Sequence, residues 1–307
     1  MILSERIEVP LIPDCGPCIM DSLKTLVPLL TSDENEQADY FALAFRRLSE
    51  GFEARIDPAP LSIKIYQELY TKAGVTDPYK AIKKRSTEAA LKALPLIDVI
   101  IKPLGGFERF QACLAAAIAG NVIDFNTAGH EPDLEGLVAI FQDIRKDGFA
   151  IDDSEHLWRS LQSQHGNLLF LGDNAGEHIL DIPLLRFIKE LGWNITYIVK
   201  GKPMVNDVTI DEALNTEITE IAEIVSSGAW AHGVPAQMVS KTFLTLVEKS
   251  DLVISKGQAN IETFPEIQRE LGVETYYITR AKCPHISQAI GAKKGDSVVL
   301  RRPKPNV

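Results

Sequence analysis

The chain has 307 residues, 45% of them hydrophobic and 24% charged, with a formal net charge of -10. These values predict one large globular domain or two, and the acidic balance argues against nucleic acid as a partner. Four cysteines are too few for a fold built on disulfides, and no membrane-spanning apolar run or signal peptide is visible. We therefore expect a cytoplasmic protein without a membrane partner, whose oligomeric state the sequence does not indicate.

The first half of the chain has the pattern of helices, because apolar residues recur there at spacings of three and four. The stretch Asp77-Pro-Tyr-Lys80 resembles a helix cap followed by Pro at the first helical position. The predicted helices cover Ile19–Leu30, Tyr40–Leu48, Asp77–Ala93, Glu108–Gly120, Asp133–Lys146 and Ser154–Gln162.

Short apolar runs, most of them separated by helical patterns, follow His165. This alternation predicts an α/β fold with a largely parallel sheet. We accordingly divide the chain into a helical part, residues 1–165, and an α/β part, residues 166–307. The predicted strands are Asn167–Leu171, Asn194–Val199, Leu252–Ser255, Thr275–Thr279 and Ser297–Leu300.

The first predicted strand ends in Gly172-Asp-Asn-Ala-Gly-Glu177, after which helical spacing resumes. Ligands of open α/β sheets bind beyond the carboxyl ends of the strands, and N–H groups at the start of a helix favour an anion. Asp173 and Asn174 add hard oxygen ligands, which suit Mg²⁺, Mn²⁺ or Co²⁺. An equally simple interpretation is that one of them only caps the helix.

The next two predicted strands also end in polar residues. Asn206 and Asp207 follow the second, and Thr209 with Glu212 forms a capping box, which leaves Asp207 available as a third oxygen ligand. The third strand runs into Lys256-Gly-Gln-Ala-Asn260, where a lysine can meet a phosphate as a point charge. Alone, Lys256 could equally extend its ammonium to solvent at the sheet rim. Together the three strand ends predict a metal beside a phosphate site.

These motifs, in this order, resemble the metal-dependent damage-control phosphatases, also known as domain of unknown function 89. The similarity is greatest to the archaeal-type branch, which carries an N-terminal CxxC, here Cys15-Gly-Pro-Cys18. Asp77-Pro-Tyr and Gly120-Asn-Val-Ile-Asp124 support it, and the resemblance extends over about residues 14–280.

The resemblance implies a helical N-terminal domain on a three-layer α/β/α core, and a phosphatase that hydrolyses small phosphorylated metabolites. It implies a divalent metal, Mg, Mn, Co or Ni, bound by Asp173, Asn174 and Asp207, with Lys256 on the substrate phosphate. The remaining candidate substrate-binding residues are Asn121, Asp124, Ala175, Gly176, Gln258 and Asn260.

For the reaction we favour direct attack by a water on the metal, oriented by Asp173, with Lys256 and the N–H groups after Asn174 holding the phosphate. An aspartyl-phosphate intermediate at Asp173 is the alternative, but no D-x-D pairing of nucleophile and acid is present. The chain departs from the family pattern at Ile19-Met-Asp-Ser22 and at Asn126-Thr-Ala-Gly129, which bears on substrate specificity.

Two other functional classes are compatible with parts of the sequence. An S-adenosylmethionine-dependent methyltransferase also uses a turn of this kind, although the G-x-G motif is absent, and a non-catalytic regulatory protein could bind a metal or metabolite in the same pocket. The CxxC pair supplies two zinc ligands at most, with Cys113, Cys283 or His285 as candidates for the others. Inert thiols and a redox pair are the alternatives for these cysteines.

Overall fold

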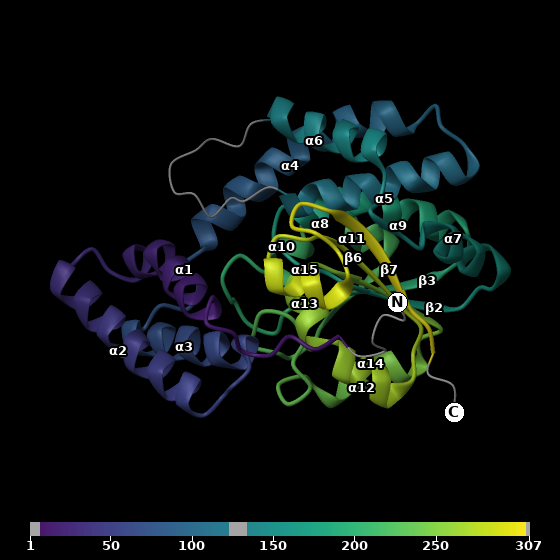
Figure 1. The fold of residues 1–307 in the computed structure, drawn as a ribbon. Coiled ribbons are helices and arrows are strands. Elements are labelled where there is room, and N and C mark those ends of the chain that lie inside the picture. Colours follow the sequence, from purple (N-terminus) through teal and green to yellow (C-terminus); the bar gives the residue numbers. More distant parts are fainter. Residues whose placement is uncertain (1–6, 123–133, 305–307) are drawn as a thin grey trace.

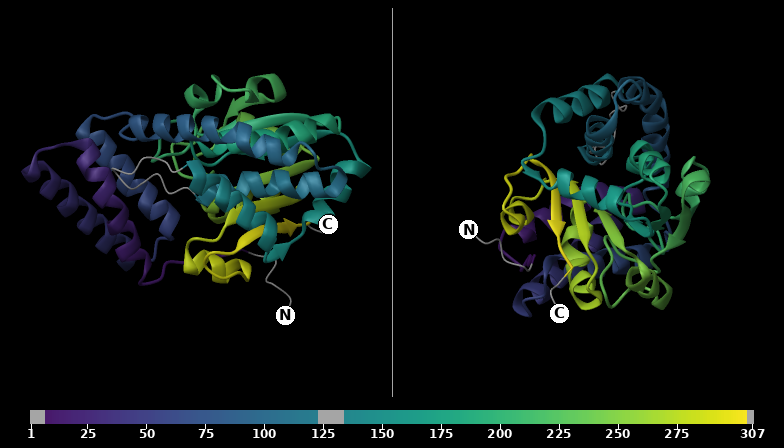
Figure 2. Two further views of the ribbon diagram at one scale, coloured as in Figure 1. Left: turned by 90° about the horizontal axis from the view of Figure 1, so that it is seen from above. Right: turned by 90° about the vertical axis from the view of Figure 1, so that its right-hand side faces the viewer.

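The structure of the protein, a computed structural model, describes residues 7–122 and 134–304. Three helices at the amino end, α1 (Cys15–Leu30), α2 (Glu34–Glu53) and α3 (Pro58–Ala73), pack on one another around their own apolar core. Asp33 accepts hydrogen bonds from the N–H groups of Asn35 and Glu36 and so fixes the start of α2. Figures 1 and 2 show this group beside the rest of the molecule rather than over a face of the sheet.

Five helices form the layer on one face of the central sheet. They are α4 (Lys80–Ile101), α5 (Gly106–Val122), α6 (Leu134–Asp147), α8 (Glu177–Leu180) and α9 (Ile182–Glu190), with α7 (Ser154–Ser163) beside them. The alanine-rich run 112–119 of α5 is almost completely buried, because α5 lies between the other helices and the sheet. Small side chains there allow the neighbouring helices to approach α5 closely.

The sheet has seven strands in the order β1-β7-β6-β5-β2-β3-β4. Its neighbouring strands are parallel, except that β7 pairs with β6 in the antiparallel sense. The strands are β1 (Ile151–Asp152), β2 (Asn167–Leu171), β3 (Asn194–Val199), β4 (Glu223–Ser226), β5 (Leu252–Lys256), β6 (Thr275–Arg280) and β7 (Ser297–Arg302).

A second apolar core lies on the other face of the sheet, under α12 (Lys241–Lys249), α13 (Gln258–Thr263), α14 (Pro265–Leu271) and α15 (Pro284–Ile290). Two short helices, α10 (Ile210–Ala213) and α11 (Ile218–Ile221), lie between β3 and β4 in the chain. With helices on both faces of a largely parallel sheet, the prediction of a three-layer α/β/α core with an added helical region is confirmed (Figure 2).

The predicted helices and strands all exist, with differences at their ends. Helix α4 begins at Lys80 rather than after Asp77, and it continues through Pro95 to Ile101. The sequence interpretation missed the two strands β1 and β4.

The division at residue 165 stays a prediction, because the packing does not break there: β1 pairs with β7, and α4–α6 lie against the α/β part. Within residues 7–122 and 134–304, no helix is both long and apolar enough to cross a membrane.

Candidate functional site

Strand β2 lies at the point where the order in which the chain adds strands to the sheet reverses. From β2 the chain adds β3 and β4 on one side, and it then crosses over to add β5 on the other. The carboxyl ends of β2, β3 and β5 therefore meet at one edge, which is where open α/β sheets bind ligands. These are the ends that carry Asp173, Asp207 and Lys256.

The loops after β2 and β3 are joined by backbone hydrogen bonds. The N–H of Ala175 donates to Asn206 O at 2.8 Å, and the N–H of Val208 donates to Asp173 O at 2.9 Å. Asn174 and Asp207 face each other in an isolated antiparallel bridge. This pairing brings together the three residues predicted from separate motifs as metal ligands.

The side-chain amide of Asn174 has a fixed orientation. Its Nδ2 donates to Glu177 Oε1 at 2.7 Å and to Asp173 Oδ2 at 3.2 Å. Because both amide protons are used in this way, the amide oxygen is left as the group available to the cavity that Asn174 lines. An amide oxygen is the atom that would ligate a hard cation.

Asp207 is buried on a strained loop. Its Oδ2 lies 3.6 Å from the Lys200 ammonium and has no hydrogen-bond partner among the described residues. Two residues earlier, the β-branched Val205 adopts φ 49°, a left-handed conformation that such residues rarely adopt. Its N–H donates to the hydroxyl of Tyr70 on α3 at 3.0 Å, which helps to hold this conformation.

Buried negative charge dominates the electrostatics of the site. Burial, and after it the charges of Glu177 and Asp207, raise the pKa of Asp173 well above its ordinary value. Burial raises the pKa of Asp207 to about 6, against the opposing effect of Lys200. The site is thus short of positive charge in the metal-free protein, which fits a cation as its partner.

Gly257 allows β5 to approach the metal-ligand candidates. It has φ 81°, and a Cβ at this position would lie 1.9 Å from Asp173 Oδ2. Any larger residue would collide with the carboxylate, so the glycine of the Lys-Gly-Gln motif is required by this contact.

Lys256 lies beneath the site rather than in the cavity. Its ammonium is fully buried, 2.6 Å from both Asp181 Oδ1 and Ala117 O, and 3.6 Å from Glu177. Burial alone would lower the pKa of Lys256, but the carboxylates of Asp181 and Glu177 raise it. In this conformation Lys256 holds the acidic groups behind Asn174, and its contact with a phosphate stays a prediction.

The candidate substrate-binding residues also have internal partners. The N–H of Ala175 donates to Asn206 O, and the N–H of Gly176 donates to His178 Nδ1 at 3.0 Å. Both N–H groups therefore have internal partners in this conformation, and their contact with a phosphate stays a prediction. Asn260 donates to the carbonyl oxygens of Gly172 and Lys256.

Gln258 accepts from the N–H groups of Lys282 and Cys283 and lines the cavity. Asp124 lies outside the described residues, as does the side chain of Asn121, whose backbone belongs to the last turn of α5.

A cavity of about 580 Å³ opens at this edge of the sheet, and Asp173, Asn174 and Asp207 line it. Lys282, which follows β6, also lines it and partly offsets the burial effect on Asp173. The sequence interpretation missed Lys282 and Lys200. The signal for Lys200 was present, because Lys200 follows the buried strand β3 as Lys256 ends β5.

The wall of the cavity opposite the sheet comes from α1 and α3, and its polar groups are neutral. Ser62 Oγ lies 3.1 Å from His232 Nε2, and Ser22 Oγ lies 2.5 Å from the Tyr66 hydroxyl. Burial lowers the pKa of His232 to about 4, so the imidazole is neutral at physiological pH. In the same cavity, burial raises the pKa of Glu262 to about 7.

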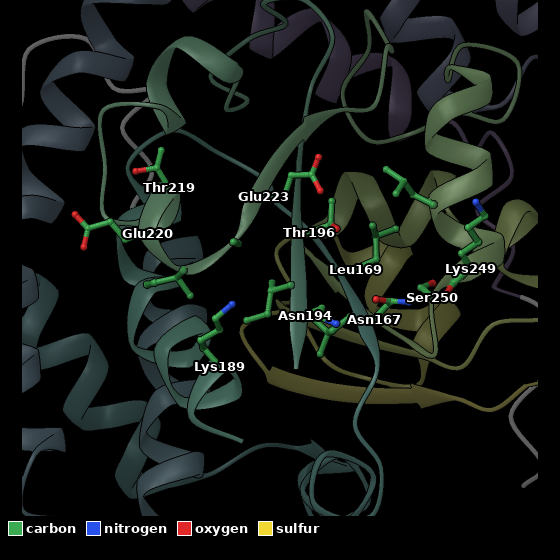
Figure 3. A pocket seen from close by; sticks show the side chains of 15 residues that line it. Asn167, Leu169, Lys189, Asn194, Thr196, Thr219, Glu220, Glu223, Lys249 and Ser250 are labelled. Carbon is green, nitrogen blue, oxygen red and sulfur yellow. Dashed lines mark hydrogen bonds between the residues drawn. The ribbon is translucent and has the colours of Figure 1, made fainter. Parts of the chain in front are cut away.

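A second hollow, of about 640 Å³, lies at the opposite edge of the sheet (Figure 3). The amino ends of β2 and β3, at Asn167 and Asn194, line it together with Lys189 and Lys249. Of the predicted site residues whose side chains are described, none lines this hollow. Volume alone therefore does not locate the site, whereas the strand polarity does.

The three oxygen donors fit a divalent cation. The Oδ2 atom of Asp207, which has no hydrogen-bond partner among the described residues, forms a hard donor set with the oriented amide of Asn174 and the buried carboxylate of Asp173. Across residues 7–122 and 134–304, no group of three His, Cys, Asp or Glu side chains is arranged to hold a metal. The proposed ligands, Asp173, Asn174 and Asp207, are not a group of this kind, because Asn174 would contribute an amide oxygen.

A family model described as the damage-control phosphatase ARMT1-like domain matches residues 11–298. The chain belongs to this family. An uncharacterized protein of Methanocaldococcus jannaschii is 31% identical over 96% of both chains. A damage-control phosphatase of Pyrococcus horikoshii is 31% identical over 94% of this chain and 96% of its own.

The fold agrees with a solved structure of the same family. The crystal structure of a DUF89 family protein from Pyrococcus horikoshii superposes with a TM-score of 0.84 at 29% identity, covering 95% of this chain and 99% of that one. The resemblance inferred from the GDNAGE and KGQAN motifs is confirmed for the family and the fold.

Proposed function

We propose that this protein is a divalent-metal-dependent phosphomonoester hydrolase that acts on small phosphorylated metabolites. The observation that carries the proposal is the backbone pairing between the loops after β2 and β3, which brings Asp173, Asn174 and Asp207 to one cavity. The name of the Pyrococcus horikoshii relative, a damage-control phosphatase, supports the same reaction class. Family membership favours this function over the methyltransferase and the regulatory alternatives.

Asp173, Asn174 and Asp207 would hold the cation. When bound, a divalent ion would neutralise charge on the phosphate and lower the pKa of an attacking water. Glu177 would keep the Asn174 oxygen directed into the cavity, since it accepts from the amide nitrogen of the same side chain. Asp173 would orient the water, as a buried carboxylate at the end of β2.

Two lysines would have different roles. Lys282 lines the cavity and would meet the phosphate as a point charge. Lys256 lies below the cavity and would act indirectly, by pairing with Asp181 and with Glu177, the carboxylate that orients Asn174. A cavity of about 580 Å³ has the size of sites for small ligands.

The proposal can be tested with chelator-treated protein and p-nitrophenyl phosphate, adding Mg²⁺, Mn²⁺, Co²⁺ or Ni²⁺ in turn. We expect turnover only with an added metal. Asp173→Asn and Asp207→Asn should each reduce kcat/KM by at least about 100-fold, since even residues that only orient metal ligands have effects of about 10- to 100-fold.

Asp211→Asn is the matched control, because Asp211 is an exposed aspartate four residues after Asp207. It should keep wild-type turnover. Full activity in the absence of metal, or equal activity in all three variants, would exclude the proposed site.

A further inference from the structure

Three of the four cysteines line the cavity that contains Asp173 and Asp207. Cys15 and Cys18 belong to the first turn of α1, and Cys283 is the residue immediately before α15. Cys113 is different, because it is buried in α5 and belongs to the apolar core. The function proposed above uses none of these thiols.

The Cys-Gly-Pro-Cys segment forms the first turn of α1 without loss of hydrogen bonds. The N–H of Cys15 donates to Ile12 O at 3.0 Å, and the N–H of Cys18 makes the first helical bond, to Asp14 O at 3.3 Å. Pro17 has no N–H, which costs nothing here because N–H groups in a first turn have no partner inside the helix. The turn therefore holds both cysteines in helical geometry.

Helical geometry brings these two residues to a distance that a disulfide can span. Residues three apart in an α-helix have Cα atoms about 5 Å apart, and disulfides join Cα atoms about 4.4–6.8 Å apart. Cys18 is exposed and Cys15 is half-buried, so a small oxidant in solution can reach the pair.

A zinc site fits this arrangement poorly. Structural zinc takes four ligands, and across the described parts of the chain no three Cys, His, Asp or Glu side chains are grouped to hold a metal. His285, a fourth candidate, has its Nε2 2.7 Å from the carbonyl oxygen of Pro10. Two thiols at disulfide spacing favour redox chemistry instead.

We propose that Cys15 and Cys18 form a reversible dithiol–disulfide pair in the wall of the site cavity. A low-molecular-weight disulfide such as oxidised glutathione is the oxidant. One thiolate attacks it and forms a mixed disulfide, releasing one glutathione thiolate that takes up a proton. The second cysteine then displaces the other glutathione, so one S–S bond breaks, one forms, and two thiols leave.

Cys15 is not an activated thiol, because its pKa is not lowered. Burial raises the pKa of Cys15, so little thiolate is present at neutral pH and exchange is slow. Samples therefore need equilibration before the thiols are counted.

The test is a titration of the full chain, freed of metal by chelation and equilibrated without air in mixtures of oxidised and reduced glutathione. The protein is then denatured, so that the buried Cys113 also reacts, and free thiols are alkylated, counted by mass and mapped on peptides. We expect two of the four cysteines to become protected at the oxidising end, in one peptide that has lost two hydrogens. Excess dithiothreitol should restore all four.

Two variants make the result specific. Cys283→Ser removes the third cavity thiol and should leave the protected pair unchanged, whereas Cys15→Ser should abolish it. Four reactive thiols in every mixture, glutathione adducts without an internal disulfide, or a disulfide to Cys283 would each overturn the proposal. The number of free thiols does not depend on hydrolysis. The result of this test is therefore independent of the proposed function.

Discussion

At the scale of single residues, the site contains buried carboxylates whose charges destabilise the folded protein. Asp173 is buried beside Glu177 and Asp207, and their charges add to the effect of burial in raising its pKa. An acid whose pKa is raised by folding ionises more readily in the unfolded chain. The folded state therefore loses stability as the pH rises through the ordinary aspartate range towards the raised pKa.

We therefore expect Asp173→Asn to stabilise the metal-free protein while removing activity. At pH 8 with a chelator, its free energy of unfolding in urea should exceed the wild-type value by about 0.5–2 kcal/mol. At pH 4 the difference should be smaller, because the carboxyl is then protonated in the folded state and only about half ionised in the unfolded chain. A variant less stable than wild type at pH 8 would contradict this account of the buried charge.

At the scale of elements, one buried lysine joins the helical layer to the loop of Asp207. Lys83 of α4 lies 2.6 Å from Asp77 and 2.7 Å from Glu212 of α10. Glu212 in turn accepts from both the N–H and the hydroxyl of Thr209, which forms the predicted capping box. The Asp77-Pro-Tyr motif thus has a structural role in this conformation, next to the site.

Lys83→Met should destabilise the protein by about 3 kcal/mol, since it leaves two largely buried carboxylates without their cation. Unfolding in urea at pH 7 measures this loss. The neighbouring Lys84, whose side chain is 77% exposed, provides the control: Lys84→Met should change stability by less than about 0.5 kcal/mol. Similar values for the two variants would show that the Lys83 ion pairs contribute little.

The elements also show what could be predicted from the sequence. Strands β2 and β5 are continuous apolar runs because helices cover both sheet faces, and such runs are visible in a sequence. Strand β4 is a half-buried edge strand with the weak pattern Glu-Ile-Val-Ser, and β1 has only two residues, so both were missed.

At the site, the sequence motifs placed Asp173, Asn174 and Asp207 just after strand ends. The motifs could not indicate which way a side chain such as that of Lys256 points. Whether Lys256 faces the cavity or Asp181 depends on α5 and α8, which come from distant parts of the sequence.

At the scale of the whole molecule, the site lies between the carboxyl edge of the sheet and the amino-terminal helices. The loops after β2 and β3 carry the oxygen donors, β5 approaches through Gly257, and α1 and α3 form the facing wall. Their relative positions depend on the folded state, so an ion that binds these donors should bind the native protein far better than the unfolded chain. Binding of this kind raises stability by mass action.

Mn²⁺ should therefore raise the melting temperature of the wild-type protein, and at about 100 times its dissociation constant it should add about 2.7 kcal/mol. The rise should be much smaller in Asp173→Asn, which we expect to be the more stable protein without metal. Adding Mn²⁺ should thus narrow or reverse the difference between the two melting curves, a result that substitution of an ordinary surface acid would not give. An equal rise in both proteins would mean that the ion binds elsewhere. A crossing would identify Asp173 as a ligand whose burial costs stability until the metal is present.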